Sequence, residues 1–279
     1  MPAPAVFPYQ EVFLAVERRL IEYGSQHLPE AKVRANLDVF KKFAARALTL
    51  TDAQYYEILV MVVFYSGFKA ATVTAKQAVI KRHFPDYATV AAYTDVDIAR
   101  ILADETMIRH EGKVRGCVAN ARRFAALVNR YTSFKAYLDS FAPANTGNPA
   151  ADSSSVSIDR LLPLIESLQL FAFLGNATVF HFMTDCGYRV LKPDRVLCRI
   201  FCRLGLISSE KKLVPAVLEG IKFANATGYP IRYIDIVLVA YGQVQSMEFG
   251  IDQGICLKIP RCGECRIANH CTYRGQRAG

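Results

Sequence analysis

Four of the eight cysteines in this 279-residue chain lie close together near its C-terminal end. They follow the spacing C-x5-C-x2-C-x5-C, at Cys256, Cys262, Cys265 and Cys271. Four thiolates are the ligand set of structural zinc sites and of cubane iron–sulfur clusters. Structural zinc usually takes two close pairs of cysteines, whereas this chain has one C-x2-C pair with a five-residue gap on each side. The spacing therefore favours a 4Fe–4S cluster, with zinc as the alternative.

One carboxylate occupies a position from which it could act on a substrate. Asp194 follows Pro193 in the stretch "LKPDRVLCRIF" and can cap the helix that begins there. A carboxylate held at a helix N-terminus can also stabilise a developing positive charge or orient a water molecule. Capping alone is the alternative, and the two roles are compatible.

The chain is basic, with a net charge of +9 and a pI near 9.1. Such a charge favours a polyanionic partner, nucleic acid first. Arginines recur every four residues in one helix, on a single stripe opposite an apolar face: Arg195, Arg199 and Arg203. A second basic cluster lies in and after the cysteines: Lys258, Arg261, Arg266, Arg274 and Arg277. Two basic surfaces suit a protein that holds a nucleic-acid backbone, and a solvated helix face is the alternative for the stripe.

The stretch "FAFLGNAT" is a candidate hairpin between two helices. Gly175 permits a tight turn and a close approach of the backbone to a phosphate. Asn176, Ala177 and Thr178 then open a helix, whose free amides and dipole can bind a phosphate without reading base sequence. An ordinary corner between two helices is the alternative.

Apolar residues at three- and four-residue spacing predict helices along most of the chain. Their ranges are 12–23, 31–46, 53–66, 75–84, 95–104, 112–131, 158–168, 177–187, 214–225 and 233–245, with the arginine-striped helix beginning after Asp194. Thr51 or Asp52 can cap the third of these helices, and Thr94 or Asp95 the fifth. No run of alternating strand residues is present, so the expected fold class is all-α. Residues 142–157 form a loop by composition.

The N-terminal residues lack the charged start and apolar run of a signal peptide. The longest uncharged apolar run, residues 58–68, is far shorter than the roughly 20 residues that span a bilayer. The expectation is a soluble, cytoplasmic monomer with no membrane partner, nucleoid-associated if the source is bacterial. Cysteines in such a protein are more often ligands, nucleophiles or core residues than disulfides.

Two stretches resemble one family of DNA repair enzymes. "LQLFAFLGNATVFHFMTDCGY", residues 168–188, is similar to the helix-hairpin-helix of the 3-methyladenine DNA glycosylase I family. "MIRHEGKVRGCVANARRFAAL", residues 107–127, resembles that family's "IIRHRGKI…NAR" segment. The resemblance covers roughly residues 52–206. It implies an all-α, two-lobed helix-hairpin-helix fold with one lobe at 50–188 and a discontinuous lobe at 1–49 and 189–279.

The cysteine segment resembles the iron–sulfur loop of the endonuclease III group in the same superfamily. That group has an "IPRC"-like step and a helix similar to "VLVAYGQ", residues 237–243, before the loop. Its first gap is commonly six residues, one more than in this chain. The resemblance implies a 4Fe–4S cofactor bound by the four cysteines.

The resemblance also implies roles for individual residues. Asp194 matches an aspartate that faces the flipped nucleotide. The residues predicted to bind double-stranded DNA are those of the hairpin, Gly175, Asn176, Ala177 and Thr178, together with Arg195, Lys258 and Arg261 from the two basic clusters. Bifunctional members carry a Schiff-base lysine where this chain has Ala177, so a monofunctional enzyme is implied.

The family's pocket segment matches residues 62–70, "VVFYSGFKA", with departures. The family's glutamate is Val62 here, and its tryptophan is Ala70. Phe64, Tyr65 and Phe68 remain as candidate stacking groups, with core packing as the alternative.

The function predicted from these residues is base-excision repair. The enzyme would be a glycosylase that flips and hydrolyses damaged bases, most favourably alkylated purines such as 3-methyladenine or 7-methylguanine. The alternatives are a non-catalytic iron–sulfur DNA-binding protein, a zinc-stapled scaffold, or a glycosylase for a neutral lesion such as uracil, hypoxanthine or mispaired adenine.

Overall fold

The computed structural model describes residues 7–42, 50–141 and 158–273. Within these ranges the regular structure is helical, and an isolated antiparallel β-bridge joins Ser246 and Ile251. The expected all-α fold class is therefore confirmed. Over the same ranges, no helix has the length and apolar character needed to cross a membrane.

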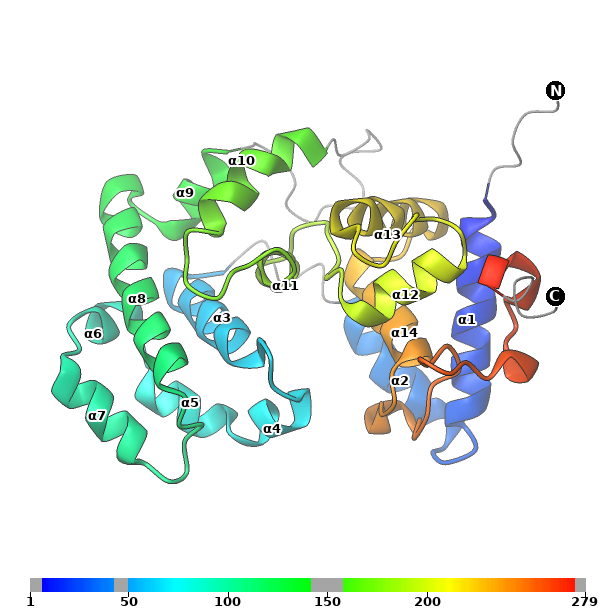
Figure 1. Cartoon of the computed structure of the whole chain (residues 1–279), viewed down its shortest axis with the longest axis horizontal. Coiled ribbons are helices and arrows are strands. Elements are labelled where there is room, and N and C mark those ends of the chain that lie inside the picture. The colour runs from blue at the N-terminus through cyan, green and yellow to red at the C-terminus, as the bar shows by residue number, and fades with distance from the viewer. Residues whose placement is uncertain (1–6, 43–49, 142–157, 274–279) are drawn as a thin grey trace. The chain divides into compact units, whose positions relative to one another are not determined.

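The described chain divides into two compact units (Figure 1). One unit takes in residues 7–42 and 189–273, and the other takes in residues 50–141 and 158–188. The first unit is thus built from the two ends of the described chain, and the second from its middle.

The discontinuous unit is a bundle of five helices in the described ranges. These are α1 (Tyr9–Gly24), α2 (Glu30–Lys41), α12 (Arg195–Arg203), α13 (Leu213–Thr227) and α14 (Ile231–Gly242). Helix α14 contacts each of the other four. Helices α12 and α14 approach closely at Gly242, where a Cβ would lie 2.6 Å from Val196 Cγ1. Phe201 stacks on Phe223 at 5.6 Å between ring centroids, which joins α12 to α13.

After α14 the chain forms short turns rather than long helices. Three 3-10 segments follow: η3 (Met247–Phe249), η4 (Cys262–Glu264) and η5 (Ala268–His270). All four clustered cysteines lie in this region.

The continuous unit is organised around one long helix. Its helices are α3 (Asp52–Tyr65), α4 (Ala70–Ala75), α5 (Gln77–His83), α6 (Tyr87–Ala91), α7 (Asp95–Ala103), α8 (Glu111–Tyr131), α9 (Phe134–Asp139), α10 (Ile158–Leu168) and α11 (Thr178–Asp185). Helix α8 packs against α3, α6, α7 and α9. Phe124 of α8 stacks on Phe134 of α9 at 4.1 Å, in the buried core.

The predicted helices agree with the long elements and differ at the short ones. The range 158–168 is reproduced by α10. The helix expected at 75–84 corresponds to α5, which is shorter at both ends. A break at Lys76 separates α5 from α4, which begins at Ala70 and was not predicted. Helices α6 and α9 were not predicted, since five or six residues are too few to show a helical period. The predicted loop at 142–157, the end of the helix predicted at 31–46, Arg274 and Arg277 lie outside the described residues.

Candidate functional site

Asp194 caps α12 as predicted. Its Oδ1 accepts hydrogen bonds from the amides of Val196 at 2.8 Å and Leu197 at 3.0 Å. These are two of the orphan amides that open any helix. Oδ2 makes no hydrogen bond within the described part of the chain, and the side chain is half-buried. One oxygen is thus fixed by the backbone while the other is left to meet a substrate or water.

A second carboxyl group in this unit was missed by the sequence analysis. Asp235 of α14 is 3% exposed and accepts a hydrogen bond from Arg232 Nη1 at 2.7 Å. Burial raises the pKa of Asp235 to about 6, and the charge of Asp194 acts in the same direction against the pull of Arg232. The sequence feature that could have revealed Asp235 is its position as the one carboxylate in the largely apolar stretch "IRYIDIVLVAYG".

Two of the three striped arginines hold the cysteine region against α12. Arg199 donates to the carbonyls of Gly242 at 2.7 Å and Cys256 at 3.2 Å. Arg203 donates to the carbonyls of Leu257 at 2.7 Å and Lys258 at 2.9 Å. Their guanidinium groups therefore satisfy carbonyls of the α14 C-terminus and of the cysteine region, and the solvated-face interpretation is wrong for both.

Arg195 and Lys258 differ from these two arginines. Neither side chain forms a hydrogen bond or ion pair with any other described residue. Both border a cavity of about 910 Å³ that also takes in Ser208, Glu210 and Tyr273. Their cationic ends are therefore available to an anionic partner.

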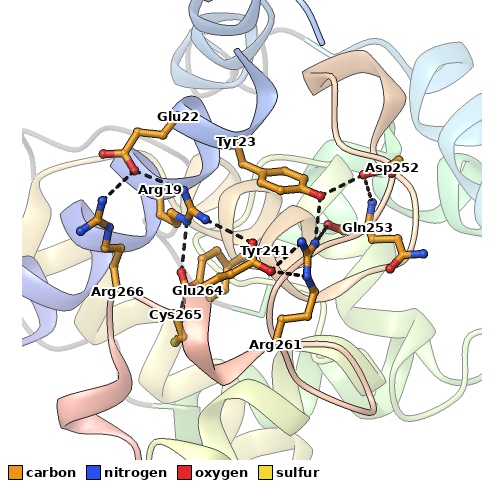
Figure 2. A network of polar contacts seen from close by, with 10 residues as sticks. All are labelled: Arg19, Glu22, Tyr23, Tyr241, Asp252, Gln253, Arg261, Glu264, Cys265 and Arg266. Atoms are coloured by element: carbon orange, nitrogen blue, oxygen red, sulfur yellow. Dashed lines mark hydrogen bonds and ion pairs between the residues drawn. The ribbon is translucent and has the colours of Figure 1, made fainter. Parts of the chain in front are cut away.

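Arg261 is an anchor inside a polar network (Figure 2). Its guanidinium pairs with Glu264 at 2.7 Å and donates to Tyr23 Oη at 2.9 Å, while lying 5.0 Å from the centroid of the Tyr23 ring. Arg19 reaches the same glutamate and also donates to its backbone carbonyl at 3.1 Å. The network links the cysteine region to α1. The guanidinium of Arg261 is therefore already paired within the described protein, unlike the side chains of Arg195 and Lys258.

The four clustered cysteines are all half-buried and free of disulfides. Arg203 Nη1 donates to Cys256 Sγ at 3.2 Å, and Tyr241 Oη donates to Cys265 Sγ at 3.3 Å. Cys271 Sγ donates to the Arg203 carbonyl at 3.3 Å. Among the residues that the structure describes, no three His, Cys, Asp or Glu side chains are close enough to hold a metal ion. Three of the four thiols, those of Cys256, Cys265 and Cys271, are thus each anchored on α12 or α14.

The predicted hairpin in the other unit has an unusual backbone. Phe173 has a φ of +67°, a region that residues other than glycine rarely adopt. Asn120 of α8 accepts from the Ala172 amide at 2.7 Å and donates to the Ala172 carbonyl at 3.0 Å. Thr178 Oγ1 donates to the Phe173 carbonyl at 2.6 Å. Several side chains therefore hold this conformation in place.

The start of α11 leaves backbone donors free. The amides of Gly175, Asn176 and Ala177 form no hydrogen bond with any other described residue. No side chain caps the helix, which begins at Thr178. The sequence predicted free amides at Asn176, Ala177 and Thr178 for a phosphate-binding hairpin, and this set shares Asn176 and Ala177 with that prediction.

The predicted pocket aromatics do not share one environment. Phe64 is fully buried and packs on Phe84 at 5.9 Å, so it belongs to the core. Tyr65 is half-buried, with its hydroxyl 3.0 Å from Thr74 Oγ1. Phe68 is half-buried against His110. Tyr65 and Phe68 are the aromatic side chains of this segment that reach the surface.

Known proteins are similar to part of this chain. The chain is 30% identical to DNA-3-methyladenine glycosylase 1 of Escherichia coli (strain K12) over 112 residues, which is 38% of this chain and 59% of that protein. The chain thus spans about three-fifths of that curated relative. A crystal structure of 3-methyladenine DNA glycosylase I is similar at 26% identity over 50% of this chain and 80% of that one, with a TM-score of 0.41. The Staphylococcus aureus enzyme, solved for its recognition of 3-methyladenine, is similar at 25% identity over 50% of this chain and 78% of that one, with a TM-score of 0.42.

A family model for methyladenine glycosylase matches residues 47–192. The match includes the hairpin and the segment with Tyr65 and Phe68, and it ends two residues before Asp194. The resemblance of the cysteine loop to the endonuclease III group therefore stays a prediction. Because the match takes in more than half of the chain, the chain belongs to the methyladenine glycosylase family.

Proposed function

We propose that this protein is a DNA glycosylase of base-excision repair that releases alkylated purines. The observation that carries the proposal is the family match over the unit whose hairpin presents the free amides of Gly175, Asn176 and Ala177. Glycosylases must extrude the target base, because the glycosidic bond is inaccessible within the stack. A protein that acts in this way has to hold the backbone firmly while one nucleotide leaves the duplex.

Alkylated purines are the favoured substrate class on chemical grounds. Alkylation at N3 or N7 places a positive charge on the base and weakens its bond to the sugar, so little protonation of the leaving group is required. The segment that matches the family pocket has Val62 in place of the family's glutamate. Tyr65 and Phe68 are the proposed groups that stack on the base, because Phe64 is buried in the core.

Asp194 is the proposed catalytic carboxylate. Two backbone amides hold Oδ1, and the positive end of the α12 dipole favours negative charge at this position. The free Oδ2 could stabilise the positive charge that develops on the deoxyribose as the base departs, or orient the attacking water. Water is the proposed nucleophile, because Ala177 stands where bifunctional relatives carry a lysine.

Double-stranded DNA is the proposed partner, bound by a monomer. The hairpin amides would bind phosphate, and Arg195 and Lys258 would add long-range attraction because their side chains have no partner in the described protein. Arg261 contributes less to this proposal than the sequence analysis expected, since it already pairs with Glu264.

We propose a 4Fe–4S cluster as the cofactor of the cysteine region. The support is the donor set of four soft thiols and the hydrogen bonds that Arg203 and Tyr241 already direct at two of the sulfurs. Such a cluster would supply a rigid cross-link for the loop that carries Lys258.

The deciding experiment is a base-release assay with the purified chain. Duplexes that each carry one lesion would be incubated with the protein, and the free bases separated by chromatography. We expect release of 3-methyladenine or 7-methylguanine, an abasic product without strand cleavage, and no covalent complex after borohydride treatment. Rapid release of uracil or hypoxanthine with methylated duplex untouched would refute the substrate class. Binding to all duplexes without release of any base would favour the non-catalytic alternative.

A further inference from the structure

Lys113 of α8 is a buried cation with no acidic partner. The residue is 3% exposed, and it forms no ion pair with any other described residue. Its ammonium donates instead to the backbone carbonyls of Val63 and Ser66, the latter at 2.6 Å. Both carbonyls lie at the C-terminal end of α3. The last carbonyls of a helix have no intrahelical donor, and the negative end of the helix dipole lies there, so both features favour a cation.

Two aromatic rings complete the surroundings of this ammonium. Nζ lies 4.5 Å from the centroid of the Phe173 ring and 5.4 Å from that of Phe68. Both distances are within the range of an attractive cation–π interaction, which gains strength when the cation is desolvated. Burial lowers the pKa of Lys113, because desolvation disfavours the charged ammonium. The carbonyls and rings around Nζ offset part of this cost.

Phe173 is the residue that links Lys113 to the hairpin. It is the hairpin residue with the positive φ, a conformation that is unfavourable for a residue with a Cβ and persists only where the surroundings impose it. Its ring lies on Gly116 of α8, where a Cβ would approach to 2.8 Å. Lys113, Gly116 and Asn120 are spaced by three and four residues and therefore lie on one face of α8. This face provides the ammonium, the space for the Phe173 ring, and the two hydrogen bonds to the Ala172 backbone.

We propose that Lys113 is a positioning residue for the phosphate-binding hairpin. Its ammonium fixes the ring of Phe173, and through the strained Phe173 backbone it sets the direction of the free amides at Gly175, Asn176 and Ala177. The inference rests on the proposed function in that the hairpin is taken to bind DNA. Lys113 would thus control the affinity for DNA through the backbone geometry of the hairpin, without contacting a DNA phosphate itself.

The test compares three variants with the wild-type chain. Lys113→Met keeps the length of the side chain and removes its charge, while Lys113→Arg keeps the charge. Arg115→Gln is the matched control, because it removes a cation from an exposed position of the same helix. Affinity would be measured by fluorescence anisotropy on a duplex with a tetrahydrofuran abasic analogue, and cooperativity of unfolding by thermal denaturation.

Lys113→Met should weaken binding about tenfold at a temperature where the protein is fully folded. Lys113→Arg should recover most of the loss, and Arg115→Gln should stay within about twofold of wild type. The release rate at saturating protein should change less than the dissociation constant, as expected for lost backbone binding. Wild-type affinity of folded Lys113→Met would reduce Lys113 to a structural residue and overturn the proposal.

Hydrogen exchange separates this inference from the proposed function, because it requires no DNA. In Lys113→Met the hydrogen-bonded amides of Phe171, Ala172 and Leu174 should exchange at least tenfold faster, while those in the middle of α8 keep their wild-type protection. If wild type releases no base but this selective loss is seen, the glycosylase proposal fails and the positioning role stands. If Lys113→Met does not fold, Phe173→Leu tests the same link, since it removes the ring and leaves both carbonyl contacts of Lys113. Unchanged exchange and affinity in that variant would overturn the proposal.

Discussion

The two roles of Asp194 can be separated by three substitutions at this one position. The structure shows the cap directly, through the two amides that donate to Oδ1. Replacement of a capping Asp by Ala costs about 1 kcal/mol of stability, whereas Ser and Asn remain good caps. Asp194→Ser and Asp194→Asn should therefore keep nearly the wild-type free energy of unfolding, and Asp194→Ala should lose about 1 kcal/mol.

The catalytic role predicts a different order among the same variants. All three lack the carboxylate charge, so all three should lose the stabilisation of the developing positive charge. Removal of one preorganised electrostatic group costs about 2–4 kcal/mol in the barrier, which is about 30- to 1000-fold in rate. Asp194→Ser and Asp194→Asn should thus fold normally, bind an abasic-analogue duplex normally, and release methylated bases slowly.

The assay is single-turnover base release at saturating protein, paired with urea unfolding. Asp86→Ala is the control, because Asp86 caps α6 through the amide of Thr89 at 2.8 Å in the other unit. It should lose a similar amount of stability with no change in the release rate. If Asp194→Asn and Asp194→Ser release bases at the wild-type rate, Asp194 is a cap alone and the catalytic assignment is refuted.

Three further perturbations test separate parts of the structure. Arg195→Ala with Lys258→Ala should weaken binding to every duplex and reduce the slope of log affinity against log salt by about 0.9 for each phosphate that the protein no longer neutralises; Arg261→Ala should leave that slope unchanged and lower stability instead. As the pH falls from 7 to 5, wild type should gain stability relative to Asp235→Asn, because the carboxyl of Asp235 takes up a proton near pH 6 when folded and only near its ordinary 3.8 when unfolded. The difference between the two proteins in the slope of unfolding free energy against pH approaches about 1.4 kcal/mol per pH unit. Parallel plots of unfolding free energy against pH, measured with urea, would contradict this expectation. Anaerobically purified protein should contain iron and sulfide in equal amounts and Cys262→Ser should lose both, whereas stoichiometric zinc without iron would exclude the cluster.

Local sequence patterns were sufficient for the long helices and their caps. The Thr51 hydroxyl accepts from the Gln54 amide at the start of α3, and Asp194 caps α12, both as predicted. Such contacts involve residues two to four apart, so their geometry follows from the helix itself. The helix-opening amides after Gly175 were predicted for the same reason.

Contacts between distant segments could not be predicted from the same patterns. Helical periodicity placed Arg199 and Arg203 on one stripe. It does not reveal that these side chains would donate to backbone carbonyls more than forty residues away in the chain. The positive φ of Phe173 has no signature, because the residue is not glycine. Lys113 reads in the sequence as one more polar residue of an amphipathic helix, and its burial depends on carbonyls of α3.

The ties between α1 and the cysteine region have a consequence for the order of folding during synthesis. Arg19 and Glu264 are 245 residues apart, so α1 must leave the ribosome long before its partner exists. The continuous unit lies between them in the chain, and its contacts can form while α1 and α2 wait. Domains fold as units as they emerge, and exposed apolar surface on a waiting segment favours misassembly. Val12, Phe13 and Val16 of α1 are fully buried in the finished protein, so they form an apolar surface that stays uncovered until the last helices arrive.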